Sequence, residues 1–154
     1  MKINWKKLII CIAIPLAAGG LSAFLTMDSM RSFASLNQPP LSPPPILFPI
    51  VWTILYVLMG VASYLVCMSG VSAAPLSLRV YAVQLLFNVI WPLIFFNMRL
   101  YLFAFVWLIA LLLLVIITTI LFYSCKKLAG YLLLPYIAWL CFASYLTIAI
   151  YILN

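Results

Sequence analysis

The sequence predicts an all-α membrane protein, a five-transmembrane-helix bundle that forms a single domain over residues 1–154. Composition is the first reason: 69% of the residues are hydrophobic and only 6% are charged, with a mean hydropathy of +1.34. A soluble domain carries about 25% charged residues, so this chain cannot cover a water-facing surface. The second reason is that the few charges separate five uncharged stretches. Each of them is long enough for the roughly 20 apolar residues that a spanning helix needs.

The charges and prolines together predict where each helix lies. Residues 32–78 carry no charge but are too long for one helix, and prolines crowd their first part. Proline lacks an N–H and breaks helix interiors, so residues 28–45 are predicted to form a Pro-rich loop. Residues 69–78, which contain Gly70 and Pro75, are predicted to form the next loop. The expected spans are about residues 7–27, 46–68, 79–98, 100–123 and 128–152, and the very short third connection makes spans three and four antiparallel neighbours.

The positive charges predict the orientation. Six of the eight Lys and Arg residues lie on the side of the N-terminus, and only Arg31 and Arg99 lie on the other side. The positive-inside rule then places the N-terminus in the cytoplasm and the C-terminus outside the cytoplasmic membrane. Because the cations are scattered and form no basic face, the expected partner is the lipid bilayer and not a nucleic acid.

The residue inventory excludes several function classes. The chain has no histidine and one acidic residue, Asp28, so it lacks the commonest general base and any carboxylate pair. Its four cysteines show no CxxC spacing, which argues against a disulfide framework and a zinc site. We therefore predict no catalytic residues and no metal ligands. An ion-coupled transporter is also disfavoured, because such proteins place several ionisable groups within the membrane.

The third span carries the most informative pattern. Gln84, Asn88, Trp91 and Phe95 recur at i, i+4, i+7 and i+11 and so share one helix face. Two amides inside a membrane are costly unless they find hydrogen-bond partners. They either join neighbouring helices or present a polar point to a ligand, and the sequence leaves both hypotheses open.

The second and fifth spans repeat this arrangement. Trp52 and Tyr56 share a face of the second span, and Trp139, Ala143 and Thr147 share a face of the fifth. Three spans thus each offer a tryptophan beside a small or polar residue. A mostly apolar, aromatic cavity with few polar groups suits a flat lipophilic ligand, although a bundle with core aromatics would show the same pattern.

Three blocks of sequence resemble one known family. They are PPLSPPPILFPIVWTILYVLMG (39–60), QLLFNVIWPLIFF (84–96) and LLLPYIAWLCFASYL (132–146). They match, in order, a Pro-rich first loop running into VWxxLYxxMG, then QLxxNxxWxxxFF, then LLxPYxxWxxFAxxLN. The paired glycines Gly19 and Gly20 match those of the family's first helix. On these residues the sequence is identified as a member of the TspO/MBR (translocator protein) family.

The resemblance implies a five-helix bundle, usually a homodimer, that binds porphyrins such as protoporphyrin IX and requires no cofactor. It places the family's pocket on Trp52, Asn88, Trp91, Trp139, Ala143 and Leu146. Together with the shared helix faces, the expected ligand-binding residues are Trp52, Tyr56, Gln84, Asn88, Trp91, Phe95, Trp139, Ala143 and Leu146. The expected loop lid consists of Phe33, Pro39, Pro43 and Pro44.

The first loop departs from the family pattern. Ser32-Phe33 stands where relatives usually carry Trp-Tyr, and Leu41 stands where they usually carry a second tryptophan. Indoles beside an excited porphyrin can donate electrons to it. Because this loop lacks those indoles, we expect porphyrin binding with little or no turnover. The preferred interpretation is a binder or sensor of tetrapyrroles. The alternatives are a transporter of porphyrin-like compounds, a light-dependent porphyrin-degrading enzyme and a structural subunit without a ligand.

Overall fold

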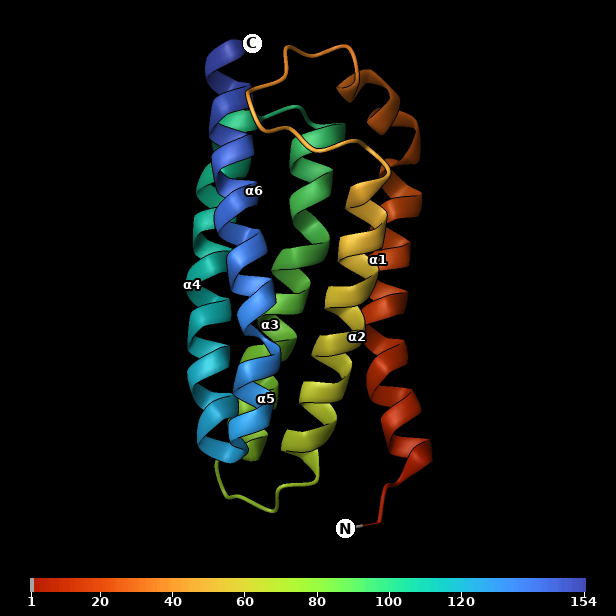
Figure 1. Cartoon of the computed structure of the whole chain (residues 1–154), viewed down its shortest axis with the longest axis vertical. Helices are drawn as coiled ribbons and strands as arrows, with labels where there is room; N and C mark the ends of the chain where they lie inside the picture. Colours follow the sequence, from red (N-terminus) through yellow and green to blue (C-terminus); the bar gives the residue numbers. More distant parts are fainter. Residues whose placement is uncertain (1) are drawn as a thin grey trace.

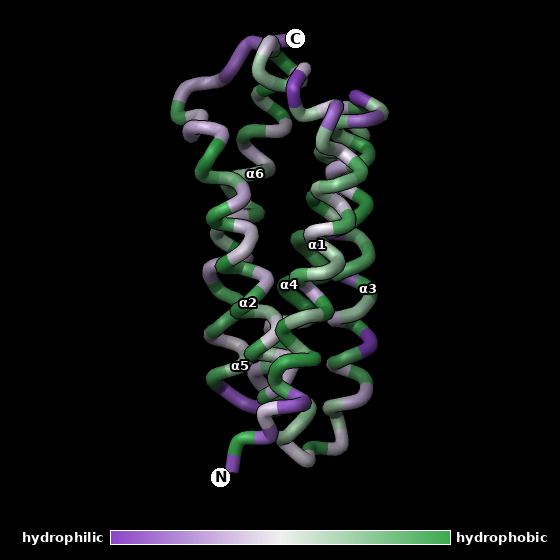
Figure 2. The backbone as a smooth tube through the Cα atoms, turned by 90° about the vertical axis from the view of Figure 1, so that its right-hand side faces the viewer, coloured by the Kyte–Doolittle hydropathy of each residue, from purple (hydrophilic) through white to green (hydrophobic). Residues whose placement is uncertain are grey.

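The computed structural model describes residues 2–154 as long helices that stand side by side (Figure 1). Five helical segments are long and apolar enough to cross a membrane, which confirms the predicted fold class. The two ends of the chain lie at opposite ends of the bundle (Figure 1), as an odd number of spans requires. In Figure 2 the hydrophilic segments gather mainly near these two ends and leave a largely apolar middle.

The structure fixes the bounds of each element. The third span continues beyond α3 as a short π-helix, η1, and the fifth span consists of α5 and α6, separated at Leu133. Pro135 lies in the first turn of α6, where a missing N–H costs no intrahelical hydrogen bond. The elements are α1 (Trp5–Phe33), α2 (Leu47–Cys67), α3 (Ala74–Pro92), η1 (Leu93–Asn97), α4 (Tyr101–Cys125), α5 (Lys127–Leu132) and α6 (Leu134–Leu153).

Helix α1 extends further than the sequence predicted. It ends at Phe33 and not near residue 27, so the loop covers residues 34–46 and its predicted start at residue 28 is wrong. Charged residues end an apolar run but do not end a helix. The additional turns are held because the Phe33 ring packs against Phe95 and Phe96, with centroids 5.8 and 5.6 Å apart.

Helix α3 begins earlier than predicted, at Ala74 and not near residue 79. The prediction treated Pro75 as a loop residue, but Pro75 lies in the first helical turn, where proline is favoured. The preceding turn contains Gly70 at φ +69°, a left-handed conformation that glycine adopts without steric cost. Helices α3 and α4 pack closely along their length, which confirms that spans three and four are neighbours.

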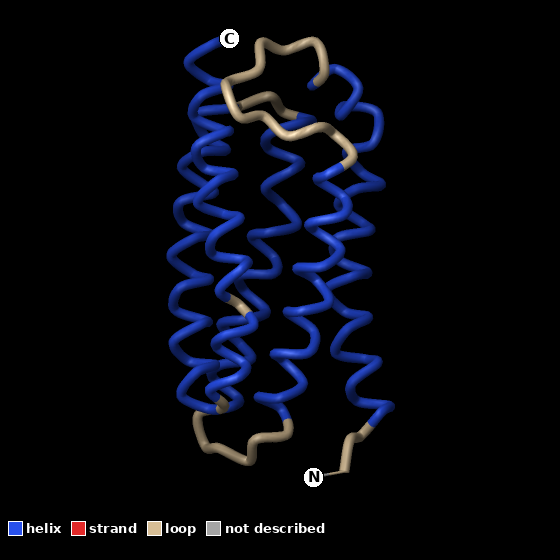
Figure 3. Tube along the Cα trace, viewed as in Figure 1, coloured by secondary structure: helices blue, strands red, loops and turns tan. Residues whose placement is uncertain are grey.

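Close helix contacts hold the bundle together. Helix α1 packs mainly on α2, and α4 packs on α3, α5 and α6. At Gly60 of α2, an added Cβ would lie 2.5 Å from the Ile12 Cα and 2.8 Å from the Cys11 carbonyl oxygen of α1. Such a close approach of two backbones is typical of membrane helix pairs, which associate through small residues. The loop over residues 34–46 crosses the far end of the bundle (Figure 3).

Candidate functional site

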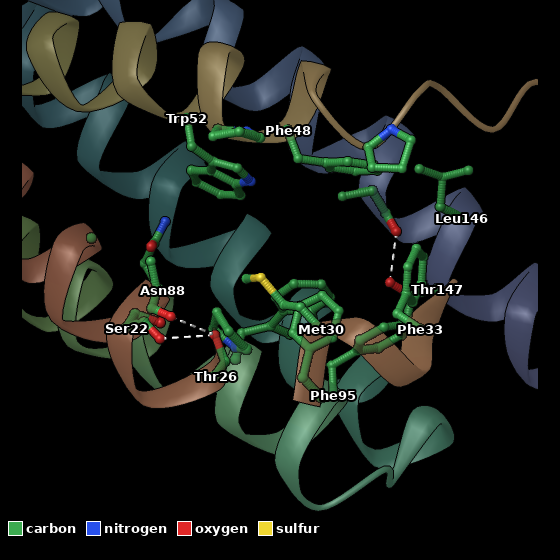
Figure 4. A pocket seen from close by; sticks show the side chains of 18 of the residues that line it. Ser22, Thr26, Met30, Phe33, Phe48, Trp52, Asn88, Phe95, Leu146 and Thr147 are labelled. Atoms are coloured by element: carbon green, nitrogen blue, oxygen red, sulfur yellow. Dashed lines mark hydrogen bonds between the residues drawn. The ribbon is translucent and has the colours of Figure 1, made fainter. Parts of the chain in front are cut away.

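A cavity of about 300 Å³ lies within the bundle, in the half nearest the 34–46 loop. Side chains of α1, α2, α3, η1 and α6 line it, and Figure 4 shows how they surround it. Its size falls at the lower end of the range for small-molecule sites, about 300–1,000 Å³. The predicted residues that line it are Phe33, Trp52, Tyr56, Asn88, Trp91, Phe95, Trp139, Ala143 and Leu146.

The other predicted site residues do not line this cavity. Gln84 lies one helical turn before Asn88 in α3 and is buried among the helices. The prolines proposed for the loop lid, Pro39, Pro43 and Pro44, are also absent from the cavity wall. The edge of the cavity is formed instead by Pro45, Phe48 and Pro49, at the junction of the loop and α2. The sequence prediction that Gln84, Pro39, Pro43 and Pro44 belong to the site therefore does not match the lining of the cavity.

A chain of hydrogen bonds explains the two amides of α3. The Tyr56 hydroxyl donates to Asn88 Oδ1 at 2.6 Å, and Asn88 Nδ2 donates to the Tyr136 hydroxyl oxygen at 2.7 Å. The Tyr136 hydroxyl in turn donates to Gln84 Oε1 at 2.7 Å. The chain joins α2, α3 and α6. Gln84 therefore connects helices, whereas Asn88 connects helices and also faces the cavity.

The hydroxyl hydrogens of Ser22, Thr26 and Thr147 in the cavity wall are occupied. The hydroxyls of Ser22, Thr26 and Thr147 donate to backbone carbonyl oxygens at 3.0, 2.9 and 2.7 Å. What they leave for a ligand is oxygen lone pairs and methyl groups. An amide NH₂ has two hydrogens, and Asn88 uses one of them for Tyr136. Asn88 therefore keeps one N–H to donate to a bound molecule.

Aromatic rings form facing walls of the cavity. On α2, Trp52 stacks on Tyr56 with centroids 5.5 Å apart and planes 29° apart. On α3 and η1, Trp91 stacks on Phe95 at 5.1 Å and 21°. Figure 4 shows Trp52 and Phe95 on opposite sides of the cavity. This arrangement offers apolar ring faces to a flat molecule held between them.

Sequence reasoning missed the contribution of α1. Gly19, Ser22, Thr26 and Met30 all line the cavity, yet no site residue before Phe33 was predicted. The available signal was the i, i+3, i+7 spacing of the first three, which places small and polar residues on one helix face. An added Cβ at Gly19 would collide with the Tyr56 ring, so this glycine sets how closely α1 approaches the cavity.

The loop above the cavity is tied to α6. Asn37 N donates to Asn154 Oδ1, and Asn154 Nδ2 donates to the Asn37 carbonyl oxygen, both at 3.1 Å. The Tyr145 hydroxyl donates to the Pro40 carbonyl oxygen at 2.7 Å. These contacts fasten the loop across the end of the bundle.

Comparison with known proteins gives consistent matches along the chain. The sequence profile of the TspO/MBR family matches residues 11–153. The "Tryptophan-rich protein TspO" of Archaeoglobus fulgidus is 37% identical over 152 residues, which cover 98% of this chain and 99% of that protein. The human "Translocator protein" is 36% identical, covering 84% of this chain and 79% of its own. The "Tryptophan-rich sensory protein" of Cereibacter sphaeroides is 32% identical, covering 90% and 85%.

Proposed function

This chain belongs to the TspO/MBR family of membrane proteins, and on that premise we propose that it binds flat lipophilic ligands, tetrapyrroles such as protoporphyrin IX above all. The observation that carries the proposal is the cavity itself. It lies between the Trp52–Tyr56 and Trp91–Phe95 pairs, and no charged side chain lines it among residues 2–154. Stacking and burial would hold the ligand, at about 25 cal/mol per Å² of apolar area.

The polar groups favour a ligand that carries a hydrogen-bond acceptor. Asn88 lines the cavity and retains one N–H without a partner among residues 2–154, while the neighbouring hydroxyl hydrogens are committed to carbonyl oxygens. A pyrrole nitrogen or a carbonyl oxygen would satisfy that donor. None of the lining residues is a histidine, aspartate or glutamate, so the cavity offers no conventional acid or base. This supports binding over turnover.

Binding coupled to sensing is the preferred role. One relative is named a sensory protein and another a translocator protein. Transport of porphyrin-like compounds is therefore the alternative, and uptake of the ligand into vesicles that contain the protein would distinguish the two roles. Light-dependent degradation is a further alternative, which the missing loop indoles disfavour.

The orientation of the protein in the membrane is inferred from its charges, and its oligomeric state from the outer surface of α1. We infer that the N-terminus is cytoplasmic and the C-terminus outside, because most cations lie at the N-terminal end. A homodimer is also expected. Gly20 faces outward, since a Cβ added there would meet nothing within 4 Å, and small residues on an outer helix face permit close helix pairing.

A titration tests the binding proposal. Purified protein is titrated with protoporphyrin IX while tryptophan fluorescence is recorded, together with Ala143→Leu and the control Ala82→Leu. Ala143 is 8% exposed and lines the cavity, whereas Ala82 is exposed on α3 away from it. Overpacking costs about 1–3 kcal/mol, and about 1.4 kcal/mol is a factor of ten.

Ala143→Leu should therefore weaken binding roughly tenfold, and Ala82→Leu should leave the dissociation constant unchanged. Absence of saturable quenching in the wild-type protein would refute the proposal. Equal affinity of a folded Ala143→Leu variant would place the ligand elsewhere.

A further inference from the structure

A second hollow lies on the outside of the bundle, between α2 and α6. We call it the α2–α6 groove; it has a volume of about 390 Å³ and is lined by Val51, Ile54, Pro135, Ala138, Trp139 and Phe142, among others. Ile54 is 54% exposed, and Ala138 and Pro135 are exposed too. Within the described part of the chain, α2 packs on α1, α3 and α5, but its backbone barely approaches α6. Side chains, and not a close contact of the two backbones, therefore form the floor of the groove.

Trp139 forms a wall shared by the groove and the cavity. It lines both hollows, so the indole separates the bilayer side from the ligand side. Its neighbours here are aromatic rings, Phe48 at 5.8 Å and Phe142 at 5.6 Å between centroids. A rotation of this side chain would connect the two hollows.

The indole of Trp139 is not held by a hydrogen bond. Its buried Nε1 has no partner among residues 2–154. Trp91 and Trp107 differ in this respect, because their Nε1 atoms donate to the carbonyl oxygens of Ala104 and Phe87 at 3.1 and 2.9 Å. Rotation of Trp139 breaks no hydrogen bond, whereas rotation of the other two would break one each.

The 34–46 loop, which covers the other way into the bundle, is hydrogen-bonded to α6. The 34–46 loop is tied to α6 by the Asn37–Asn154 pair and by the bond from Tyr145 to Pro40. These bonds hold residues 37–40 of the loop against the end of α6. A flat apolar ligand is also concentrated in the hydrocarbon of the bilayer, onto which the α2–α6 groove opens.

We propose that the α2–α6 groove is the portal through which the lipophilic ligand passes between the bilayer and the cavity, and that the Trp139 indole is its gate. The proposal rests on the proposed function, since it concerns the route to the same site. In the absence of that ligand, the acyl chain of a bilayer lipid occupies the groove and contacts Trp139.

Binding kinetics in vesicles test the route. Ala138→Phe places a ring in the groove at a residue that does not line the cavity, and Ala82→Phe is the matched control on an exposed face of α3. Ala138→Phe should slow association and dissociation of protoporphyrin IX alike, by about tenfold, with an unchanged dissociation constant. Ala82→Phe should change neither rate. Unchanged rates in Ala138→Phe, with faster rates in Asn154→Ala, would overturn the proposal and make the loop the entrance.

A second measurement needs no porphyrin. The protein is placed in vesicles of lipids with brominated acyl chains, which quench indoles that they touch. The emission lost in wild-type protein should exceed that lost in Trp139→Phe, because Trp139 borders the groove. Equal losses would show that acyl chains do not reach Trp139 and would overturn the portal. Failure of porphyrin to bind would instead refute the proposed function, and the quenching would still decide whether the groove opens onto Trp139.

Discussion

Adding one methyl group at Gly19 should disturb the cavity from the α1 side. A Cβ at this position would lie 2.7 Å from Tyr56 Cζ and 2.8 Å from its Cδ2, where carbon atoms ordinarily stand about 3.5–4.0 Å apart. The Tyr56 ring cannot yield easily, because it is 8% exposed, stacks on Trp52 and donates to Asn88 at 2.6 Å. The ring has to shift by about 1 Å, which strains or breaks that hydrogen bond.

Gly20 provides a matched control one residue along the same helix. A Cβ there would meet nothing within 4 Å. Both substitutions gain about the same from replacing glycine by alanine in a helix, roughly 1 kcal/mol, and this gain cancels when the two variants are compared. Overpacking contributes about 1–3 kcal/mol and a lost hydrogen bond about 1 kcal/mol. Gly19→Ala should therefore be less stable than Gly20→Ala by about 2–4 kcal/mol.

Thermal unfolding in detergent and porphyrin titration measure the two consequences. Gly19→Ala should unfold at a clearly lower temperature than Gly20→Ala and should bind protoporphyrin IX several-fold more weakly, because Tyr56 and Asn88 both line the cavity. In a detergent that keeps the protein monomeric, Gly20→Ala should match or exceed the wild-type stability. Equal unfolding temperatures and equal affinities in the two variants would refute the reasoning from the Gly19–Tyr56 contact.

Two further predictions concern the hydrogen-bond chain and the orientation. Tyr136→Phe removes the donor to Gln84 Oε1, while Gln84 Nε2 already lacks a partner among residues 2–154. The substitution should therefore lower the free energy of unfolding by about 1–3 kcal/mol, and adding Gln84→Leu should recover part of the loss. An unchanged unfolding temperature in Tyr136→Phe would contradict the assigned hydrogen bond. Cys67 is exposed at the end of α2 nearest the N-terminus. With the other cysteines replaced, it should react with a membrane-impermeant thiol reagent only after cell lysis, and labelling of intact cells would reverse the orientation.

The polar positions of α3 show how far sequence reasoning reached. The spacing of Gln84 and Asn88 placed both amides on one face, and both were expected in the site. The structure divides them, because the Tyr136 hydroxyl accepts from Asn88 and donates to Gln84. Gln84 therefore takes part in the contact between α3 and α6 and does not line the cavity. No pattern within α3 predicts this, since the deciding group comes from α6.

The bounds of the helices show a similar division. Charges and a cluster of prolines were enough to count the spans, because charged residues are costly in the middle of a spanning helix and closely spaced prolines break a helix. They were not enough to end α1 or to begin α3. The end of α1 depends on the packing of Phe33 against η1, and the start of α3 depends on the place of Pro75 within its first turn.

The sequence by itself determined that this is a five-helix membrane protein and that α2, α3 and α6 each carry a tryptophan on a face with small or polar neighbours. Only the tertiary structure decided that α1 turns Gly19, Ser22 and Thr26 toward the cavity and that Trp139 stands between the cavity and the α2–α6 groove. The physical reason is the solvent. Lipid chains are as apolar as the interior of the bundle, so hydrophobic patterning does not distinguish the inner face of a membrane helix from its outer face, and contacts between helices make that choice.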